Sequence, residues 1–149
     1  MLENSDNKNS RILALDYGQK RTGIAVTDPL KIIASPLETV NTLKIFEFLK
    51  KYTETETVEA FVVGMPKNLD NTDTNNTPHV KGFVKSLAKL FPSIPIHLED
   101  ERFTSKMALA AMIAAGTTKK QRQNKGNIDK ISAVIILESF MMKLLKCEV

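Results

Sequence analysis

An acidic residue, Asp16, ends an otherwise apolar segment near the start of the chain, in the sequence RILALD over residues 11–16. An ionised carboxylate among isoleucine, leucine and alanine must be paired, bound to a metal or placed at the end of the strand that faces water. Oxygen-only ligation by a carboxylate suits Mg²⁺ or Mn²⁺, which keep several waters and take phosphate oxygen as a further ligand. The structural alternative is an Asx-type turn that Asp16 begins before Gly18.

A second acid, Asp129, lies near the start of a segment with helical spacing. Counting forward by four, seven and eleven residues reaches Ala133, Ile136 and Phe140, so the carboxylate shares one side of the predicted helix with an apolar stripe. An acid in the first turn of a helix also complements the helix dipole, which is the structural alternative. Taken together with Asp16, Asp129 fits better as an acid aimed over the sheet.

The third carboxylate is either Asp100 or Glu101, which follow a predicted strand over residues 94–98. Strand alternation groups Asp100 with Leu98 and places Glu101 on the other face. If this strand lies two positions from the strand of Asp16, about 9.6 Å separates the two backbones, and a Glu side chain covers more of that gap than an Asp. We therefore favour Glu101 as the metal ligand and keep Asp100 as the alternative.

Cations gather in residues 117–127, a stretch without acids that holds Lys119, Lys120, Arg122 and Lys125. The whole chain has 21 Lys and Arg against 17 Asp and Glu, and its net charge of +4 mildly favours polyanionic partners. We expect this basic segment, together with Arg21 and Arg102, to contact the phosphates of a nucleic acid. The alternatives are a solvated connector for the segment and an intramolecular ion pair for Arg102.

Length and composition limit the class of protein. A chain of 149 residues, 42% hydrophobic and 26% charged, suits one ordinary globular domain. We predict a disordered tail over residues 1–10 and a single domain over residues 11–146. The first ten residues lack the features of a signal peptide, and no apolar run is long enough to span a membrane. The single Cys147 can form no internal disulfide, which fits a reducing compartment, so we expect a cytoplasmic protein with no membrane partner.

The elements that must position these acids follow from the apolar pattern. The pattern predicts strands over residues 11–16, 22–27, 34–40, 59–64 and 94–98, and helices over 43–51, 80–91, 104–115 and 127–146. Early hairpins followed by strand–helix–strand units imply a mixed sheet covered by helices. We predict an α/β ribonuclease H-like fold with a five-stranded mixed sheet flanked by helices. Actin-like ATPase domains share this core, but 149 residues leave no room for their second lobe.

Four segments carry a family resemblance: LALDYGQKRTGIAVTDP, VVGMP, LEDERFTS and NKGNIDKISAVIILESF. In this order they resemble the YqgF/RuvX family, described as Holliday-junction resolvases and pre-16S ribosomal RNA nucleases, over about residues 11–140. The resemblance implies a nuclease of ribonuclease H-like fold. It places the family's acids on Asp16, on Asp100 or Glu101, and on Asp129.

Two positions depart from the family's pattern. The loop after the VVG-x-P strand reads Asp70-Asn71 where the family has Asp-Gly, which weakens the case for a tight turn there. The last helix has Ser132-Ala133 where the family has Ala-Ala, a change that keeps close packing possible.

The function that we expect is metal-dependent hydrolysis of phosphodiester bonds by Asp16, Glu101 and Asp129. The resemblance gives structured RNA as the partner, with trimming of the 5′ end of the small-subunit ribosomal RNA precursor as the role. Two alternatives remain open. One is the resolution of branched DNA at the same site, which would favour a dimer because a four-way junction needs two symmetric cuts. The other is a nucleic-acid-binding factor without catalysis. We expect a monomer or a weak homodimer.

Overall fold

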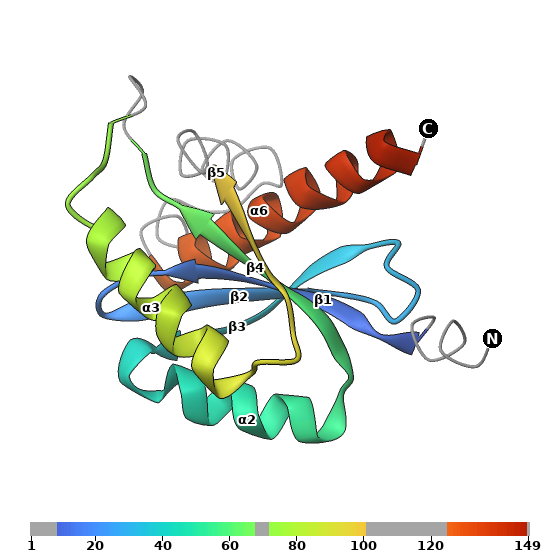
Figure 1. Ribbon diagram of the computed structural model, residues 1–149, viewed down its shortest axis with the longest axis horizontal. Helices are drawn as coiled ribbons and strands as arrows, with labels where there is room; N and C mark the ends of the chain where they lie inside the picture. The colour runs from blue at the N-terminus through green and yellow to red at the C-terminus, as the bar shows by residue number, and fades with distance from the viewer. Residues whose placement is uncertain (1–8, 68–71, 101–124, 149) are drawn as a thin grey trace.

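Five strands form one mixed sheet in the order β3-β2-β1-β4-β5 (Figure 1). The computed structural model describes residues 9–67, 72–100 and 125–148. The strands are β1 (Arg11–Tyr17), β2 (Arg21–Thr27), β3 (Ala34–Asn41), β4 (Val58–Met65) and β5 (Ile96–Asp100). β1 pairs antiparallel with β2, and β2 with β3, whereas β4 runs parallel to both β1 and β5. The predicted mixed sheet is therefore confirmed, with β5 two positions from β1.

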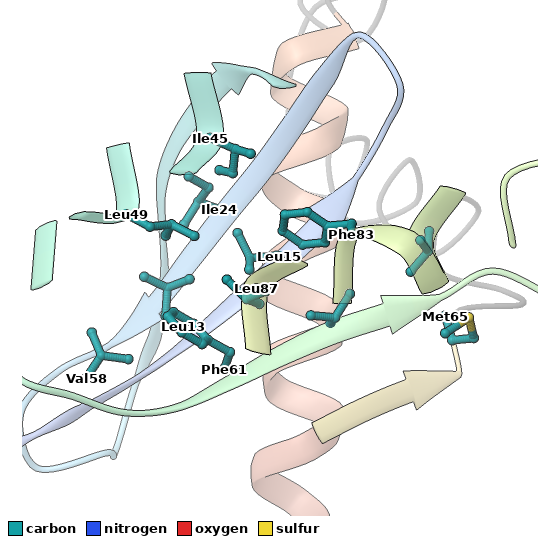
Figure 2. Close-up of a cluster of buried hydrophobic side chains, with 12 residues drawn as sticks. Leu13, Leu15, Ile24, Ile45, Leu49, Val58, Phe61, Met65, Phe83 and Leu87 are labelled. Atoms are coloured by element: carbon teal, nitrogen blue, oxygen red, sulfur yellow. The ribbon is translucent and has the colours of Figure 1, made fainter. Parts of the chain in front are cut away.

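Helices cover both faces of this sheet. A short 3-10 helix, η2 (Thr42–Lys44), leads into α2 (Ile45–Thr55), which lies with α3 (Thr77–Leu90) on one face; α6 (Lys125–Glu148) covers the other (Figure 1). The larger core lies between the sheet and α2 and α3 (Figure 2) and is formed by Leu13, Leu15, Ile24, Ile45, Leu49, Val58, Phe61, Val63, Met65, Val80, Phe83 and Leu87. The core under α6 is formed by Ile12, Ala14, Ala25, Ala60, Val62, Ala133, Ile136 and Leu137.

The continuous apolar run in β1 follows from burial on both faces. Leu13 and Leu15 belong to the core under α2 and α3, whereas Ile12 and Ala14 belong to the core under α6. The α6 face carries small side chains, among them Ala14 and Ala25, so the helix can pack close to the strands.

Several boundaries differ from the sequence-based expectation. α6 begins at Lys125, so Lys125 belongs to this helix and not to the basic loop in which we expected it. Ser10, which we expected in a disordered tail, is fully buried, and its hydroxyl donates to the carboxylate of Glu59. The predicted helix over residues 104–115 lies outside the described residues. None of the described helices is both long and apolar enough to cross a membrane.

Candidate active site

Asp16 lies half-buried near the carboxyl end of the central strand. Its backbone pairs with Gly23 of β2, and on the other side the register of β1 with β4 continues to Gly64. Ala14 packs under α6 and Tyr17 packs on the side of α2 and α3. Because side chains alternate along a strand, Asp16 belongs to the face that α6 covers.

Two glycines flank Asp16 in the neighbouring strands. Side chains directly opposite one another in neighbouring strands stand about 4.5–5.5 Å apart, so any residue larger than glycine at position 23 or 64 would place a Cβ next to the carboxylate. Gly23 and Gly64 carry none. A carboxylate oxygen donor at a strand end suits a hydrated Mg²⁺ or Mn²⁺ ion.

The turn after Asp16 is held rigidly because Gly18 is packed against the backbone. A Cβ on Gly18 would lie 2.5 Å from the carbonyl oxygen of Arg21, which is too close for any other residue. The Thr42 hydroxyl donates to the Gly18 carbonyl at 2.6 Å and lies 2.9 Å from the Thr22 hydroxyl. The end of β1 is therefore tied to β2 and to the start of η2.

The amino-terminal end of α3 is held against the end of the sheet at which Asp16 lies. The Asn76 side-chain amide donates to the carbonyl oxygen of Tyr17 at 3.1 Å, and the Thr77 hydroxyl donates to the carbonyl oxygen of Pro66 at 2.9 Å. The Tyr17 ring also stacks on Phe83 of α3, with 4.6 Å between the ring centroids. The carboxyl ends of β1 and β4 and the first turn of α3 thus form one connected unit.

The register of β5 decides which of its acids share the face of Asp16. Glu99 pairs with Gly64, so it lies in the row of Asp16 and on the same face. Asp100 pairs with Met65 and is exposed. By alternation it lies with Ile96, which packs on the side of α2 and α3, opposite the face of Asp16. Glu101 lies outside the described residues.

Glu99 is an important residue that the sequence reasoning missed. Only 3% of its surface is exposed, and both carboxylate oxygens accept bonds from α6. The Ser139 hydroxyl donates to Oε2 at 2.7 Å and the Lys143 ammonium to Oε1 at 2.8 Å. Ser139 and Lys143 are four residues apart on a helix and therefore neighbours on one face, but this spacing does not identify Glu99 as their common partner. Glu99 serves to fasten β5 to α6.

The direction of α6 places residue 129 toward the same end of the sheet as Asp16. Ile12 near the start of β1 lines one cavity with Met141 and Leu144 in the last third of α6. The 12 residues back from Met141 to Asp129 span about 18 Å of helix, and the four from Ile12 to Asp16 span about 13 Å of strand. In both figures α6 begins near the end of the sheet at which β1 turns into β2.

The apolar stripe that Asp129 was expected to share is confirmed in part. Ala133, Ile136 and Leu137 are buried against the sheet, and Phe140 packs beside them. His97, an exposed residue of β5, lies against the Phe140 ring at 4.9 Å between centroids. The Asp129 side chain is outside the described part of the structure.

The cations predicted to contact phosphates are described only in part. Arg21 is half-buried at the first position of β2, directly after the turn that follows Asp16. Lys125 is the first residue of α6. The others, Arg102, Lys119, Lys120 and Arg122, lie outside the described residues. Among the side chains that are described, no three of His, Cys, Asp or Glu are grouped to hold a metal.

A family model described as "RuvX: Holliday junction resolvase" matches residues 10–143. The chain belongs to the RuvX family. A relative from Christiangramia forsetii is 51% identical over 132 residues, which cover 89% of this chain and 98% of the relative. One from Phocaeicola vulgatus is 52% identical over 132 residues, which cover 89% of this chain and 95% of the relative. Both carry the name "Putative pre-16S rRNA nuclease".

Solved structures agree with the fold of this RuvX protein. Thermus thermophilus RuvC in complex with a Holliday junction substrate matches with a TM-score of 0.53 and 18% identity, over 91% of this chain and 96% of that chain. The same RuvC in a second structure matches with a TM-score of 0.50 and 14% identity, over 90% of this chain and 96% of that chain. At this identity the likeness concerns the fold alone, and the predicted ribonuclease H-like α/β fold is confirmed.

Proposed function

We propose that this RuvX-family protein is a metal-dependent nuclease that hydrolyses phosphodiester bonds at the 5′ end of pre-16S ribosomal RNA in the cytoplasm. The observation that carries this proposal is the setting of Asp16. The carboxylate stands half-buried at the carboxyl end of the central strand, between Gly23 and Gly64 on the two neighbouring strands. The names of relatives at about half identity, "Putative pre-16S rRNA nuclease", support the choice of RNA as substrate.

Asp16, Glu101 and Asp129 would hold Mg²⁺ or Mn²⁺ through carboxylate oxygens, and Asp100 is the alternative to Glu101. A bound divalent cation supplies a water of lowered pKa and neutralises charge on the leaving oxygen. Glu101 is favoured because simple alternation from Glu99 returns to the face of Asp16 two residues later.

We assign binding of the RNA to the cations that the sequence predicts to contact phosphates. Arg21 follows the turn after Asp16, and Arg102 follows Glu101 in the sequence. We assign the basic segment with Lys119, Lys120, Arg122 and Lys125 to the phosphate backbone, where it adds affinity without reading sequence. The protein acts as a monomer or weak homodimer and needs no membrane partner.

The test is incubation of the pure protein with Mg²⁺ or Mn²⁺ on a pre-16S RNA fragment and on a four-way DNA junction. We expect cleavage of the RNA that chelation of the metal abolishes. Asp16→Asn should lower the rate by several orders of magnitude and keep both RNA binding and the circular dichroism spectrum. Asp28→Asn is the matched control, because Asp28 caps the β2–β3 loop by accepting bonds of 2.7 Å from the amides of Ile32 and Ile33.

Other outcomes separate the alternatives. Cleavage of the junction with the RNA left intact would favour branched-DNA resolution. The family description "Holliday junction resolvase" supports this alternative. Binding of either substrate without metal-dependent product would favour a non-catalytic factor. A folded Asp16→Asn variant that keeps most of the activity would exclude Asp16 as a metal ligand.

A further inference from the structure

One flank of α3 carries a row of lysines that the proposed function does not use. Lys81, Lys85 and Lys89 are spaced by four residues, and all three are exposed. The helix rises about 1.5 Å per residue, so neighbouring lysines are about 6 Å apart and the row spans about 12 Å. The helix packs on the sheet by its other side, through the buried residues Val80, Phe83 and Leu87.

Of the two helices on this face of the sheet, α3 has a net positive charge and α2 does not. The segment Thr77–Leu90 has three lysines and no aspartate or glutamate, so its formal charge is +3. The neighbouring segment Ile45–Thr55 has two lysines and two glutamates, so its formal charge is zero. A face that only needed solubility would not require the separation of charge between two adjacent helices.

Only one lysine of the row has a carboxylate partner in the described part of the chain. Lys81 lies 3.7 Å from Asp73, which is bound more closely by Lys67 at 2.7 Å. For Lys85 and Lys89 the described residues provide no ion pair. Within the described part of the chain, no ion pair therefore neutralises the charge of Lys85 or Lys89.

The row starts beside the end of the sheet at which β1 finishes and Asp16 lies. Asn76, just before α3, donates to the carbonyl oxygen of Tyr17, the residue after Asp16. The stacking of Tyr17 on Phe83 holds the first half of α3 against the end of β1. From that end α3 leads away across the sheet (Figure 1).

We propose that Lys81, Lys85 and Lys89 bind the sugar–phosphate backbone of the substrate strand outside the bond that is cut. This inference rests on the proposed function and adds a path for the substrate along α3. The charge of +3 on this exposed row complements the negative charge of a nucleic-acid backbone. Flexible ammonium groups bind phosphate as point charges, so the row adds affinity but no sequence preference.

The test measures RNA binding in the Asp16→Asn background without metal, so that no cleavage interferes. The variant Lys81→Gln/Lys85→Gln/Lys89→Gln should bind the pre-16S fragment less tightly, with a salt dependence flatter by about 0.7 in log–log slope per lost contact. The matched control replaces Lys44, Lys50 and Lys51, which are exposed on η2 and α2, with glutamine. The control should keep the slope of the parent.

With metal and an active site intact, the α3 variant should raise KM and leave kcat unchanged. An unchanged salt slope, or an equal loss in the control, would overturn the proposal. Equal melting temperatures of the variants and the parent show that a loss of binding does not come from unfolding. If the parent binds RNA but never cuts it, the nuclease proposal fails while the slopes still decide the role of α3. If the parent binds no nucleic acid, both proposals fail.

Discussion

Asp16 and Glu99 lie in the same row of the sheet, with Gly64 between them, on the face that α6 covers. The first is the candidate metal ligand, and the second is held by Ser139 and Lys143 of α6. One face of three adjacent strands therefore both carries Asp16 and anchors the helix on which Asp129 lies.

The third carboxylate can be identified by a pair of substitutions. Because the register puts Asp100 on the face opposite Asp16, we expect Glu101→Gln to lower the cleavage rate far more than Asp100→Asn. Metal affinity, measured by Mn²⁺ titration of each variant, should fall in the same order. A greater loss for Asp100→Asn would assign the ligand to Asp100, and equal losses would contradict the preference for Glu101.

The turn after β1 should tolerate no side chain at position 18. Gly18→Ala would force its Cβ against the carbonyl oxygen of Arg21, and we expect a loss of about 1–3 kcal/mol in the free energy of unfolding, as for overpacking. Gly82→Ala is the matched control, since nothing lies within 4 Å of a Cβ at that helical position. It should stabilise the protein by about 0.5–1 kcal/mol. Denaturant unfolding measures both, and a neutral Gly18→Ala would contradict the rigid turn.

Substitution of Lys143 should lower the free energy of unfolding more than substitution of Glu99, its partner in the ion pair. The Glu99 side chain is 4% exposed and that of Lys143 is 62% exposed. Lys143→Met leaves a buried carboxylate with one hydroxyl donor, so we expect a loss of about 1–3 kcal/mol. Glu99→Gln leaves an ammonium that water can solvate, and its cost should be smaller. A larger loss for Glu99→Gln in chemical denaturation would contradict this order and show that the buried carboxylate tolerates the loss of Lys143.

The ion pair of Lys67 and Asp73, in the connection from β4 to α3, should weaken in acid. The hydrogen bond from Lys67 holds the pKa of Asp73 below its ordinary value, and Lys81 adds to the effect. A lowered pKa in the folded state means that this ion pair stabilises the fold above the unfolded pKa of Asp73, and that the stabilisation is lost as the pH falls through the folded pKa. We thus expect loosening below about pH 4.

Carboxyl NMR titration checks this prediction. Lys67→Gln should move the pKa of Asp73 upward. The pKa of Asp28 is also lowered, chiefly by the amide of Ile33, and should not change in that variant. A shift of both groups would point to a general change in charge instead of the local bond.

The sequence predicted the strands, their hairpins and the buried side of the last helix, because each depends on a local apolar period. The sequence did not predict that Asp16 and Asp100 lie on opposite faces of the sheet. Alternation orders residues within one strand, but the register between β1, β4 and β5 depends on long crossovers. The contact of Glu99 with Lys143 joins residues 44 positions apart. No local pattern specifies such a pair.

The position of α6 after all five strands in the sequence has a consequence for the newly made protein. Ile12, Ala14 and Val62 are buried beneath this helix, yet α6 is synthesised only after every strand of the sheet. One side of the sheet therefore stays uncovered until α6 has been made, and apolar surface of that kind favours aggregation and chaperone binding.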